Sequence, residues 1–196
     1  MTDEVRGPQS RQVSRRRFIT MGLVGAAPMI IPAAAWAGMK VKTSAHARKA
    51  EFRALSFYNL HTGERLKTTY WEQGEYIPDA LDEINYILRD YRQDEIKPID
   101  RNLLDLLVTL RDRLHSSANF EVISGYRSPI TNAMLHANSE GVAAHSLHID
   151  GRAIDIKVPG RPLSLVRAAA LTMQQGGVGY YPGRFVHVDT GRVRWW

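Results

Sequence analysis

The segment SLHIDGRAIDIK, residues 146–157, places a histidine and an aspartate seven positions apart, at His148 and Asp155. Between them stand Gly151 and Ala153, which have two of the smallest side chains. If GRAID forms a strand, both small residues share a face with Asp155, because side chains alternate with a period of two. That face would have room for an ion and a substrate. His148 could fold back over it from the preceding loop.

A second segment, FVHVDTG, repeats this alternation near the end of the chain. His187 and Asp189 share one face of the expected strand, while the valines beside His187 point to the core. If this strand pairs with GRAID, then His148, Asp155 and His187 converge. Two imidazoles and one carboxylate suit catalytic Zn²⁺, which keeps its fourth position for water. For four of the other histidines we expect ordinary structural hydrogen bonds: His61, His115, His136 and His145.

The N-terminal segment has the layout of an export signal. SRRRFI precedes an apolar run that ends in Ala35-Trp36-Ala37, and the pair Arg15-Arg16 fits a twin-arginine motif. We interpret residues 1–37 as a signal that signal peptidase removes after transport by the twin-arginine translocase, and we expect a periplasmic protein. A signal-anchor helix is the alternative, which the two prolines of the run disfavour. Residues 38–50 are interpreted as a flexible lead-in.

Composition limits the class of the remaining domain, residues 51–196. The chain has 196 residues, no cysteine and a net charge of +6, of which the segment 1–37 contributes about half through five arginines and two acids. A charge this small on the remaining domain does not indicate nucleic-acid binding. Without disulfides the domain must rely on its apolar core, which a chain of this length can form. We expect one monomeric domain.

Periodicity predicts the elements of this domain. Apolar spacing from Leu81 to Tyr91 indicates a helix, and Asp100 and Ser164 are suitable N-caps for two further helices, the second of which ends at Gly176. Most strands follow the first helices, so the predicted class is α+β, with a small antiparallel sheet that carries the metal site and packs against helices. The expected elements are a hairpin over 51–71, helices over 77–93, 100–115 and 164–177, a helix or turn-rich segment over 129–139, and strands over 120–124, 152–158, 178–181 and 184–190.

Several motifs together resemble a known family. SLHIDGRAID with the later FVHVDTG resembles the zinc D-Ala-D-Ala metallopeptidase superfamily, which includes proteins of the hedgehog-like fold. LSFYNLHTGE, INYILRDYR, VISGYRSP, GGVGYYP and VHVDTGRVRWW are similar to the murein endopeptidase K (YcbK-like) family within it. The resemblance covers about residues 51–196 and includes the twin-arginine signal.

This resemblance implies a zinc peptidase that acts on peptidoglycan stem peptides or their crosslinks. It assigns the metal to His148, Asp155 and His187, and it maps a catalytic arginine of the superfamily onto Arg127 of SGYRSP. A guanidinium offers a fixed fork of donors for a carboxylate or a developing oxyanion. The alternative is that Arg127 braces an acid such as Asp155 or Asp189. Candidate substrate contacts are two aromatic residues, Tyr126 and Tyr181.

The sequence departs from the family pattern at one position. Many relatives have an acidic general base three positions before the last histidine ligand, where this chain has Arg184. Asp189 could serve as the base, or it could orient a ligand histidine, and both roles remain open at this stage. If it serves neither, then Glu140 and Asp150 are the next acids to consider.

The expected function is an exported zinc-dependent murein endopeptidase that remodels the cell wall. The main alternative is a non-catalytic domain of the same fold that binds zinc and peptidoglycan, which the arginine at position 184 favours. A purely structural domain without metal would make the His-Asp-His pattern accidental. Metal content and turnover on purified sacculi distinguish the three.

Overall fold

A computed structural model describes residues 52–139 and 141–196. The predicted export signal over 1–37, the predicted lead-in over 38–50 and Glu140 lie outside the described residues. Within the two described ranges, no helix is long and apolar enough to cross a membrane.

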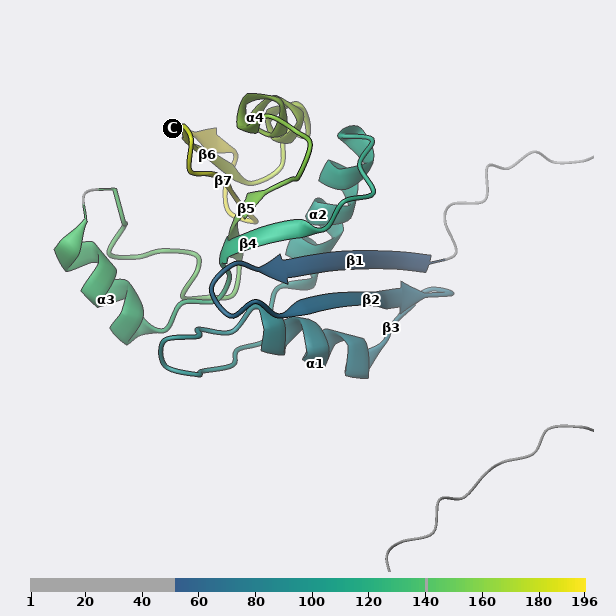
Figure 1. The fold of residues 1–196 in the computed structure, drawn as a ribbon, viewed down its shortest axis with the longest axis horizontal. Helices are drawn as coiled ribbons and strands as arrows, with labels where there is room; N and C mark the ends of the chain where they lie inside the picture. Colours follow the sequence, from purple (N-terminus) through teal and green to yellow (C-terminus); the bar gives the residue numbers. More distant parts are fainter. Residues whose placement is uncertain (1–51, 140) are drawn as a thin grey trace, which may run out of the picture. The chain divides into compact units, whose positions relative to one another are not determined.

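The described chain forms a single mixed sheet with four helices (Figure 1). The strands follow the order β3-β2-β1-β4-β5-β7-β6-β8 across the sheet. The strands are β1 (Phe52–Asn59), β2 (Arg65–Glu72), β3 (Glu75–Tyr76), β4 (Phe120–Ser124), β5 (Ala153–Lys157), β6 (Gly177–Tyr181), β7 (Phe185–Asp189) and β8 (Arg194–Trp195), and the helices are α1 (Pro78–Ile87), α2 (Arg101–Arg113), α3 (Pro129–Asn138) and α4 (Leu163–Thr172).

The sheet differs from the predicted small antiparallel sheet in size and in strand direction. It has eight strands, and the pairs β1–β4 and β6–β8 are parallel. The β1–β4 pair is possible because the connection between these strands includes α1 and α2, and parallel neighbours need such a long crossover. The predicted hairpin is confirmed as β1 and β2, and the prediction missed both two-residue strands.

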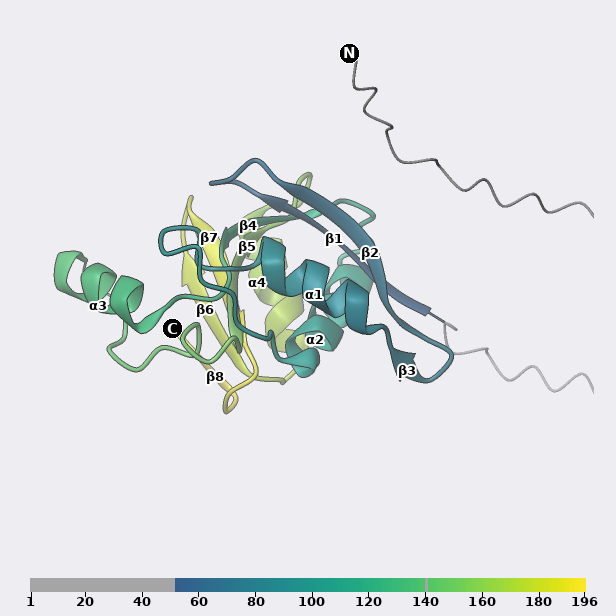
Figure 2. The same cartoon turned by 90° about the horizontal axis from the view of Figure 1, so that it is seen from below.

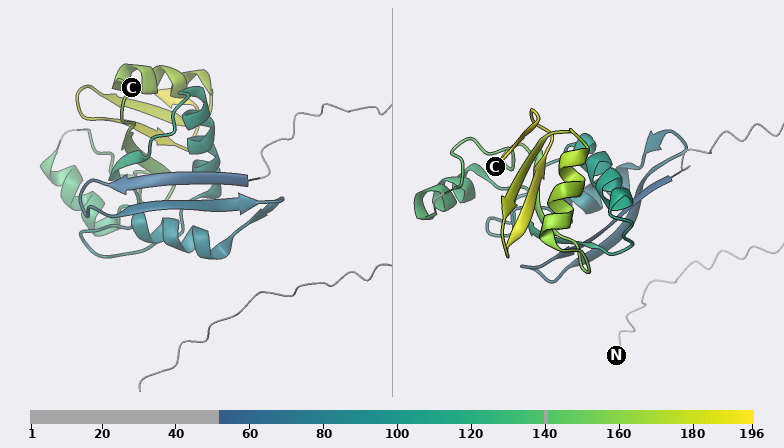
Figure 3. Two further views of the ribbon diagram at one scale, coloured as in Figure 1. Left: turned by 45° about the vertical axis from the view of Figure 1, so that its right-hand side comes forward. Right: turned by 90° about the horizontal axis from the view of Figure 1, so that it is seen from above.

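Apolar residues alternate along the central strands and place the core on one face of the sheet. Ile154 and Ile156 of β5, with Val186 and Val188 of β7, are at most 1% exposed. Helix α1 packs against β2, α2 against β1, and α4 against β6 and β7, and Figures 2 and 3 show these helices together on one side. Because alternate side chains point to opposite faces, the polar residues between these core residues face away from the helices.

Two helices depart from their predicted bounds. The first ends at Ile87 rather than at residue 93, since the carbonyl of Leu88 accepts a hydrogen bond from the backbone N–H of Tyr126 at 2.8 Å. Helix α4 begins at Leu163 after Pro162, so Ser164 lies inside the helix and is not its N-cap. Its last residue is Thr172, before the predicted end at Gly176. Asp100 caps α2 as predicted, by accepting the Asn102 N–H.

Gly151 has a different role from the predicted one. It lies before β5, in a turn, with φ at +67°, so it does not share the strand face with Asp155. A Cβ at this position would stand 2.6 Å from the carbonyl oxygen of Pro98. Glycine is therefore required for a positive φ and a close backbone approach. Only Ala153, opposite Asp189 in the pairing of β5 with β7, keeps the predicted place.

Candidate functional site

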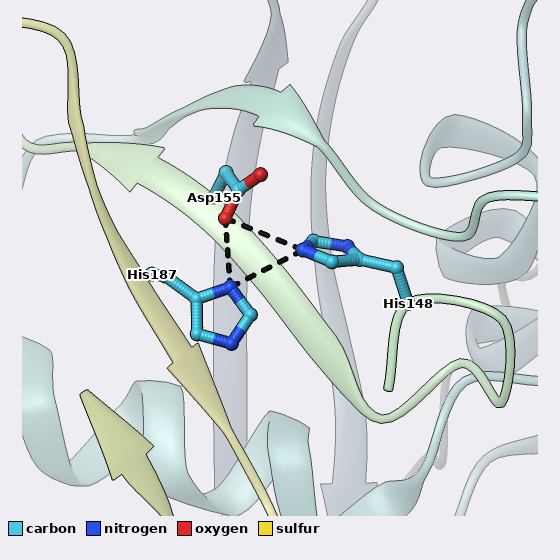
Figure 4. Close-up of side chains that lie close together, drawn as sticks. All are labelled: His148, Asp155 and His187. Atoms are coloured by element: carbon cyan, nitrogen blue, oxygen red, sulfur yellow. Dashed lines mark hydrogen bonds and ion pairs between the residues drawn. The ribbon is translucent and has the colours of Figure 1, made fainter. Parts of the chain in front are cut away.

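Two neighbouring strands and one turn bring the predicted metal ligands together. Asp155 of β5 lies directly opposite His187 of β7 in the antiparallel register. His148 comes from the turn before β5, which a hydrogen bond from the Gly151 N–H to the His148 carbonyl closes at 3.2 Å. Figure 4 shows the three side chains pointing toward one another. The convergence that strand alternation predicted is therefore present in the structure.

The three side chains meet through one atom each. His148 Nε2 lies 3.2 Å from His187 Nδ1 and 3.3 Å from Asp155 Oδ1. His187 Nδ1 lies 2.9 Å from the same carboxylate oxygen. All three residues are buried, and their ligand atoms lie close enough together to hold one metal ion.

The hydrogen bonds on the far side of each imidazole determine which nitrogen carries a proton. His148 Nδ1 lies 2.7 Å from the carbonyl oxygen of Gly125, which can only accept, so this nitrogen donates. His187 Nε2 donates in the same way to Asp189 Oδ2 at 3.0 Å. In the neutral form of both rings, the two inner nitrogens therefore present lone pairs toward Asp155. Three acceptors face one another, and they require a positive charge between them.

The pKa values of the three residues also reflect the need for a positive charge between them. Burial lowers the pKa of His148 below its usual value. Burial also disfavours the charged form of His187, but its hydrogen bonds to Asp155 and Asp189 outweigh this effect and raise its pKa to about 8. Burial raises the pKa of Asp155, yet the two histidines hold it well below its usual range. A proton on His187 thus supplies the positive charge when no metal is bound.

The three facing atoms of His148, Asp155 and His187 fit a zinc ion better than they fit a proton. One proton can satisfy only part of a group of three acceptors, whereas a cation contacts all three. Zinc binds nitrogen and oxygen ligands at about 2.0–2.1 Å in a tetrahedron, which puts ligand atoms about 3.3 Å apart. The observed separations of 3.2, 3.3 and 2.9 Å are close to this value. Three ligands would leave the fourth position open.

Asp189 is fully occupied by donors. Oδ1 accepts from the backbone N–H groups of Gly177 and Gly191 at 2.9 and 2.8 Å, and from Arg194 at 3.0 Å. Oδ2 accepts from His187 at 3.0 Å and from Arg194 at 2.7 Å. Burial raises its pKa, but these hydrogen bonds outweigh burial and hold the pKa well below its usual range. Its side chain is completely buried, which separates it from any substrate.

Arg194 is a site residue that the sequence analysis missed. Its guanidinium pairs with both oxygens of Asp189 and lines the same cavity as the metal cluster. The VHVDTGRVRWW motif contains this arginine five positions after Asp189, but only the parallel pairing of β8 with β6 brings the two together. Sequence spacing alone gives no indication of that pairing.

Arg127 lies beside the cluster and contacts it directly. Its Nη2 is 3.3 Å from Asp155 Oδ2, and its other contacts are to Ser124 Oγ and Asn132 Oδ1. These contacts use four of the five guanidinium hydrogens and leave one on Nη1. Burial lowers the pKa of Arg127, and the charge of Asp155 opposes that effect. The brace to Asp155 that the sequence allowed is present, and Arg127 also lines the cavity.

A cavity of about 160 Å³ opens over the three converging side chains. Tyr181, a predicted substrate contact, lies on its wall, and so do His145, Arg184 and Trp196. Tyr126 has another place: it is 4% exposed, its hydroxyl donates to Glu95 at 2.6 Å, and it does not line this cavity. Asp150 is exposed and also absent from the cavity wall. Within the described residues, Asp155 is the one acid of the wall.

An aromatic wall stands beside His187. The Trp196 ring lies 5.2 Å from the His187 ring, and its indole N–H donates to the Tyr181 hydroxyl at 3.0 Å. A Cβ on Gly179 would stand 2.7 Å from this indole, so the ring occupies the space that glycine leaves on β6. The wall therefore places an aromatic surface next to His187.

Comparison with known proteins assigns the chain to a family. A family model described as peptidoglycan L,D-endopeptidase MepK matches residues 47–196. The Escherichia coli K12 protein named peptidoglycan L,D-endopeptidase MepK is 41% identical over 184 residues, which cover 93% of this chain and 97% of that protein. A Haemophilus influenzae protein named probable peptidoglycan L,D-endopeptidase MepK is 37% identical over 185 residues, covering 93% of this chain and 95% of that protein. No solved structure gave a significant match.

The fold and the buried histidine–carboxylate site thus occur in a chain of a peptidase class. The chain belongs to the family of peptidoglycan L,D-endopeptidase MepK, which confirms the resemblance drawn from its sequence motifs.

Proposed function

We propose that this protein is a zinc-dependent murein endopeptidase that hydrolyses peptide crosslinks or stem peptides of peptidoglycan. The supporting observation is the cluster of three buried acceptor atoms, 2.9–3.3 Å apart, at the base of a cavity. Such an arrangement is unfavourable without a cation, and its ligand types and spacing suit zinc. Family membership supports the peptide substrate, since the relatives are named peptidoglycan L,D-endopeptidases.

In this proposal His148, Asp155 and His187 hold the ion. Zinc, when bound, supplies a Lewis acid that activates water near neutral pH and polarises a carbonyl. The Gly125 carbonyl and the Asp189 carboxylate fix the two histidine rings by accepting their outer N–H groups. This arrangement leaves a lone pair on each inner nitrogen, which can then bind the ion.

Arg127 and Asp189 take separate roles in the same proposal. Arg127 holds Asp155 in place and has one N–H left that can stabilise a developing oxyanion. Asp189 orients His187 rather than moving a proton, because five donors already surround its buried carboxylate. The proposal therefore assigns proton transfer to a group other than Asp189, and His145 and Tyr181 are candidates among the described residues of the cavity wall.

A muropeptide digest tests this function. Purified sacculi and isolated crosslinked muropeptides, one set with L,D (3-3) and one with D,D (4-3) bonds, are incubated with the zinc-loaded protein. We expect cleavage, with the L,D bond preferred as the names of the relatives suggest, loss of cleavage with a chelator, and recovery when zinc is returned. Cleavage that persists in a metal-free sample would contradict the role of zinc.

A non-catalytic zinc- and peptidoglycan-binding domain is the second candidate. The observation that favours it is Arg184, on a cavity wall whose one acid among the described residues is Asp155. The superfamily resemblance implied an acid at the position of Arg184. Turnover decides between the two candidates. Stoichiometric zinc and sacculus binding without any released muropeptide would establish the binding domain.

We also propose export by the twin-arginine pathway to the periplasm, motivated by Arg15-Arg16 and by Ala35-Trp36-Ala37. Replacing both arginines by lysine should leave precursor in the cytoplasm, and the exported form should begin at Gly38. Normal export of the double-lysine variant would refute the pathway. Retention of residues 1–37 on the exported protein would indicate an anchor instead.

A further inference from the structure

Three arginines line the cavity above the metal cluster, and two of them are paired with acids. Arg127 contacts Asp155 at 3.3 Å, and Arg194 contacts Asp189 at 2.7 Å. Arg184 is exposed and has no carboxylate partner within the described residues. Among the described residues of the cavity wall, the third guanidinium is therefore a positive charge without a paired acid.

The backbone holds Arg184 at a fixed place on this wall. It follows the sequence Tyr181-Pro182-Gly183, and its N–H donates to the Tyr181 carbonyl at 2.9 Å. Gly183 has a φ of +70°, and proline followed by glycine suits the two central positions of a type II turn. The guanidinium also lies 5.6 Å from the Phe185 ring, which itself packs against Tyr181 at 4.5 Å. A tight turn and an aromatic surface thus present the charge beside the cavity.

The charges of the site determine what this wall can accept. With zinc bound, the ion would more than neutralise Asp155, and Arg127 would stay close to both. An exposed guanidinium on the wall of such a cavity is available to an entering anion, and arginine is well suited to bind a carboxylate through two parallel hydrogen bonds. A positive cleft also attracts anionic ligands from solution.

We infer that Arg184 selects peptides that carry a free carboxylate close to the bond to be cut, and disfavours peptides in which that carboxylate is amidated. This inference deepens the proposed function and rests on it, because it names a substrate group recognised at the same site. It also gives a role to the arginine at a position where the superfamily resemblance implied an acid. Arg184 acts here as a specificity-determining residue and takes no part in proton transfer.

Calorimetry with two matched peptides tests the inference without requiring turnover. The probes are synthetic crosslinked muropeptides that differ in one group, a free carboxylate or its carboxamide, next to the crosslink. Loss of a charged hydrogen bond corresponds to a roughly 10–100-fold change in affinity. The zinc-loaded wild type should therefore bind the carboxylate peptide at least about 10-fold more tightly than the amide. The preference should weaken as salt is raised.

Arg184→Gln should remove this preference by weakening binding of the carboxylate peptide, while binding of the amide stays unchanged. Arg184→Lys keeps the charge but lacks the fork of donors, so it should retain part of the preference. Arg192→Gln is the matched control, because Arg192 is also exposed but does not line the cavity. Circular dichroism and zinc stoichiometry should match wild type in all three variants.

The outcomes separate this inference from the proposed function. Equal affinity of wild type for the two peptides, or a preference that survives in Arg184→Gln, would overturn the inference. If wild type shows the preference but cleaves neither peptide, the inference stands and the catalytic proposal fails. If wild type cleaves both peptides equally well and binds them equally, the catalytic proposal stands and the inference fails.

Discussion

Two carboxylates in this molecule sit in crowded polar clusters, and the clusters differ in how their partners match. Asp105 of α2 accepts hydrogen bonds from the hydroxyls of Tyr70 and Tyr76 at 2.7 and 3.1 Å and pairs with Arg53 at 2.6 Å. Every neighbour of this acid is a donor. Asp155, by contrast, meets the inner nitrogens of His148 and His187, and the outer contacts of these rings leave lone pairs on that side.

The hydrogen bonds of the Asp105 cluster are complete, whereas the Asp155 cluster lacks a positive charge at its centre. Around Asp105 donors and acceptors balance, so the cluster stabilises the fold with the residues it already has. Around Asp155 acceptors outnumber donors at the centre, while the outer shell of Gly125 and Asp189 is well matched. Burying three acceptors that face one another is unfavourable by itself. A bound cation would interact favourably with all three.

Removing an inner ligand should produce the largest change. His148→Ala and His187→Ala should each abolish turnover and remove stoichiometric zinc, because three ligands become two. Zinc content measured on the purified proteins, beside turnover on sacculi, checks this. His145→Ala is the matched control, since His145 lines the cavity but is not one of the three converging residues, and it should keep its zinc. Full zinc occupancy in His148→Ala would refute the ligand assignment.

Disturbing the matched outer shell should have a smaller effect. Asp189→Asn should weaken zinc binding by about 10–100-fold, because the amide no longer holds the His187 ring as a carboxylate does. Metal titration measures this, and saturating zinc should restore part of the turnover. If turnover instead falls by about 10²–10⁴ while zinc still binds tightly, Asp189 is a base and the assigned role is wrong.

The stability of the metal-free protein should depend on pH, because a proton on His187 supplies the positive charge that the inner cluster lacks. Since the pKa of His187 is raised from 6.5 to about 8, its protonated form stabilises the fold below pH 6.5, and this stabilisation is lost as pH rises to 8. Because the pKa of His148 is lowered, the titration of this residue affects stability only at a more acidic pH. Thermal melts should therefore show a falling Tm between pH 6.5 and 8 without metal. Zinc-saturated protein should lack this trend, and an identical slope in both forms would count against it.

The balanced cluster should respond least. Tyr70→Phe removes one of three donors to Asp105, and a typical hydrogen bond contributes about 0.5–1.5 kcal/mol, so the free energy of unfolding should fall by this amount. Denaturant unfolding measures the loss. Zinc affinity and turnover should equal those of wild type. A change in zinc affinity would show that the two clusters are coupled.

Local periodicity in the sequence predicted which residues share a face at the centre of the site, and it predicted their convergence on the condition that the two strands pair. Strand alternation placed His187 and Asp189 on one face, and the paired register with β5 then brought Asp155 opposite His187. These relations depend on neighbouring residues along a strand, which a sequence displays directly. The same holds for Asp100, whose side chain caps α2 where the sequence indicated a helix start.

What the sequence could not give depends on contacts between distant segments. The end of α1 is fixed by a hydrogen bond from Tyr126, 38 positions after Leu88, and the place of Gly151 by the backbone of Pro98. The role of Arg194 depends on β8 joining the sheet in parallel with β6. No periodic pattern marks such pairings, so the prediction was wrong on the helix end, on Gly151 and on the sheet direction.

The five donors around Asp189 tie together segments that are otherwise separate. They come from the start of β6, from β7, from the loop after β7 and from Arg194 of β8. Local opening of residues 190–196 would therefore release the carboxylate that holds the His187 ring. Any ligand that favours the closed form must in turn suppress that opening. If His187 holds a metal as proposed, amide hydrogen exchange in this short segment should slow when the metal binds.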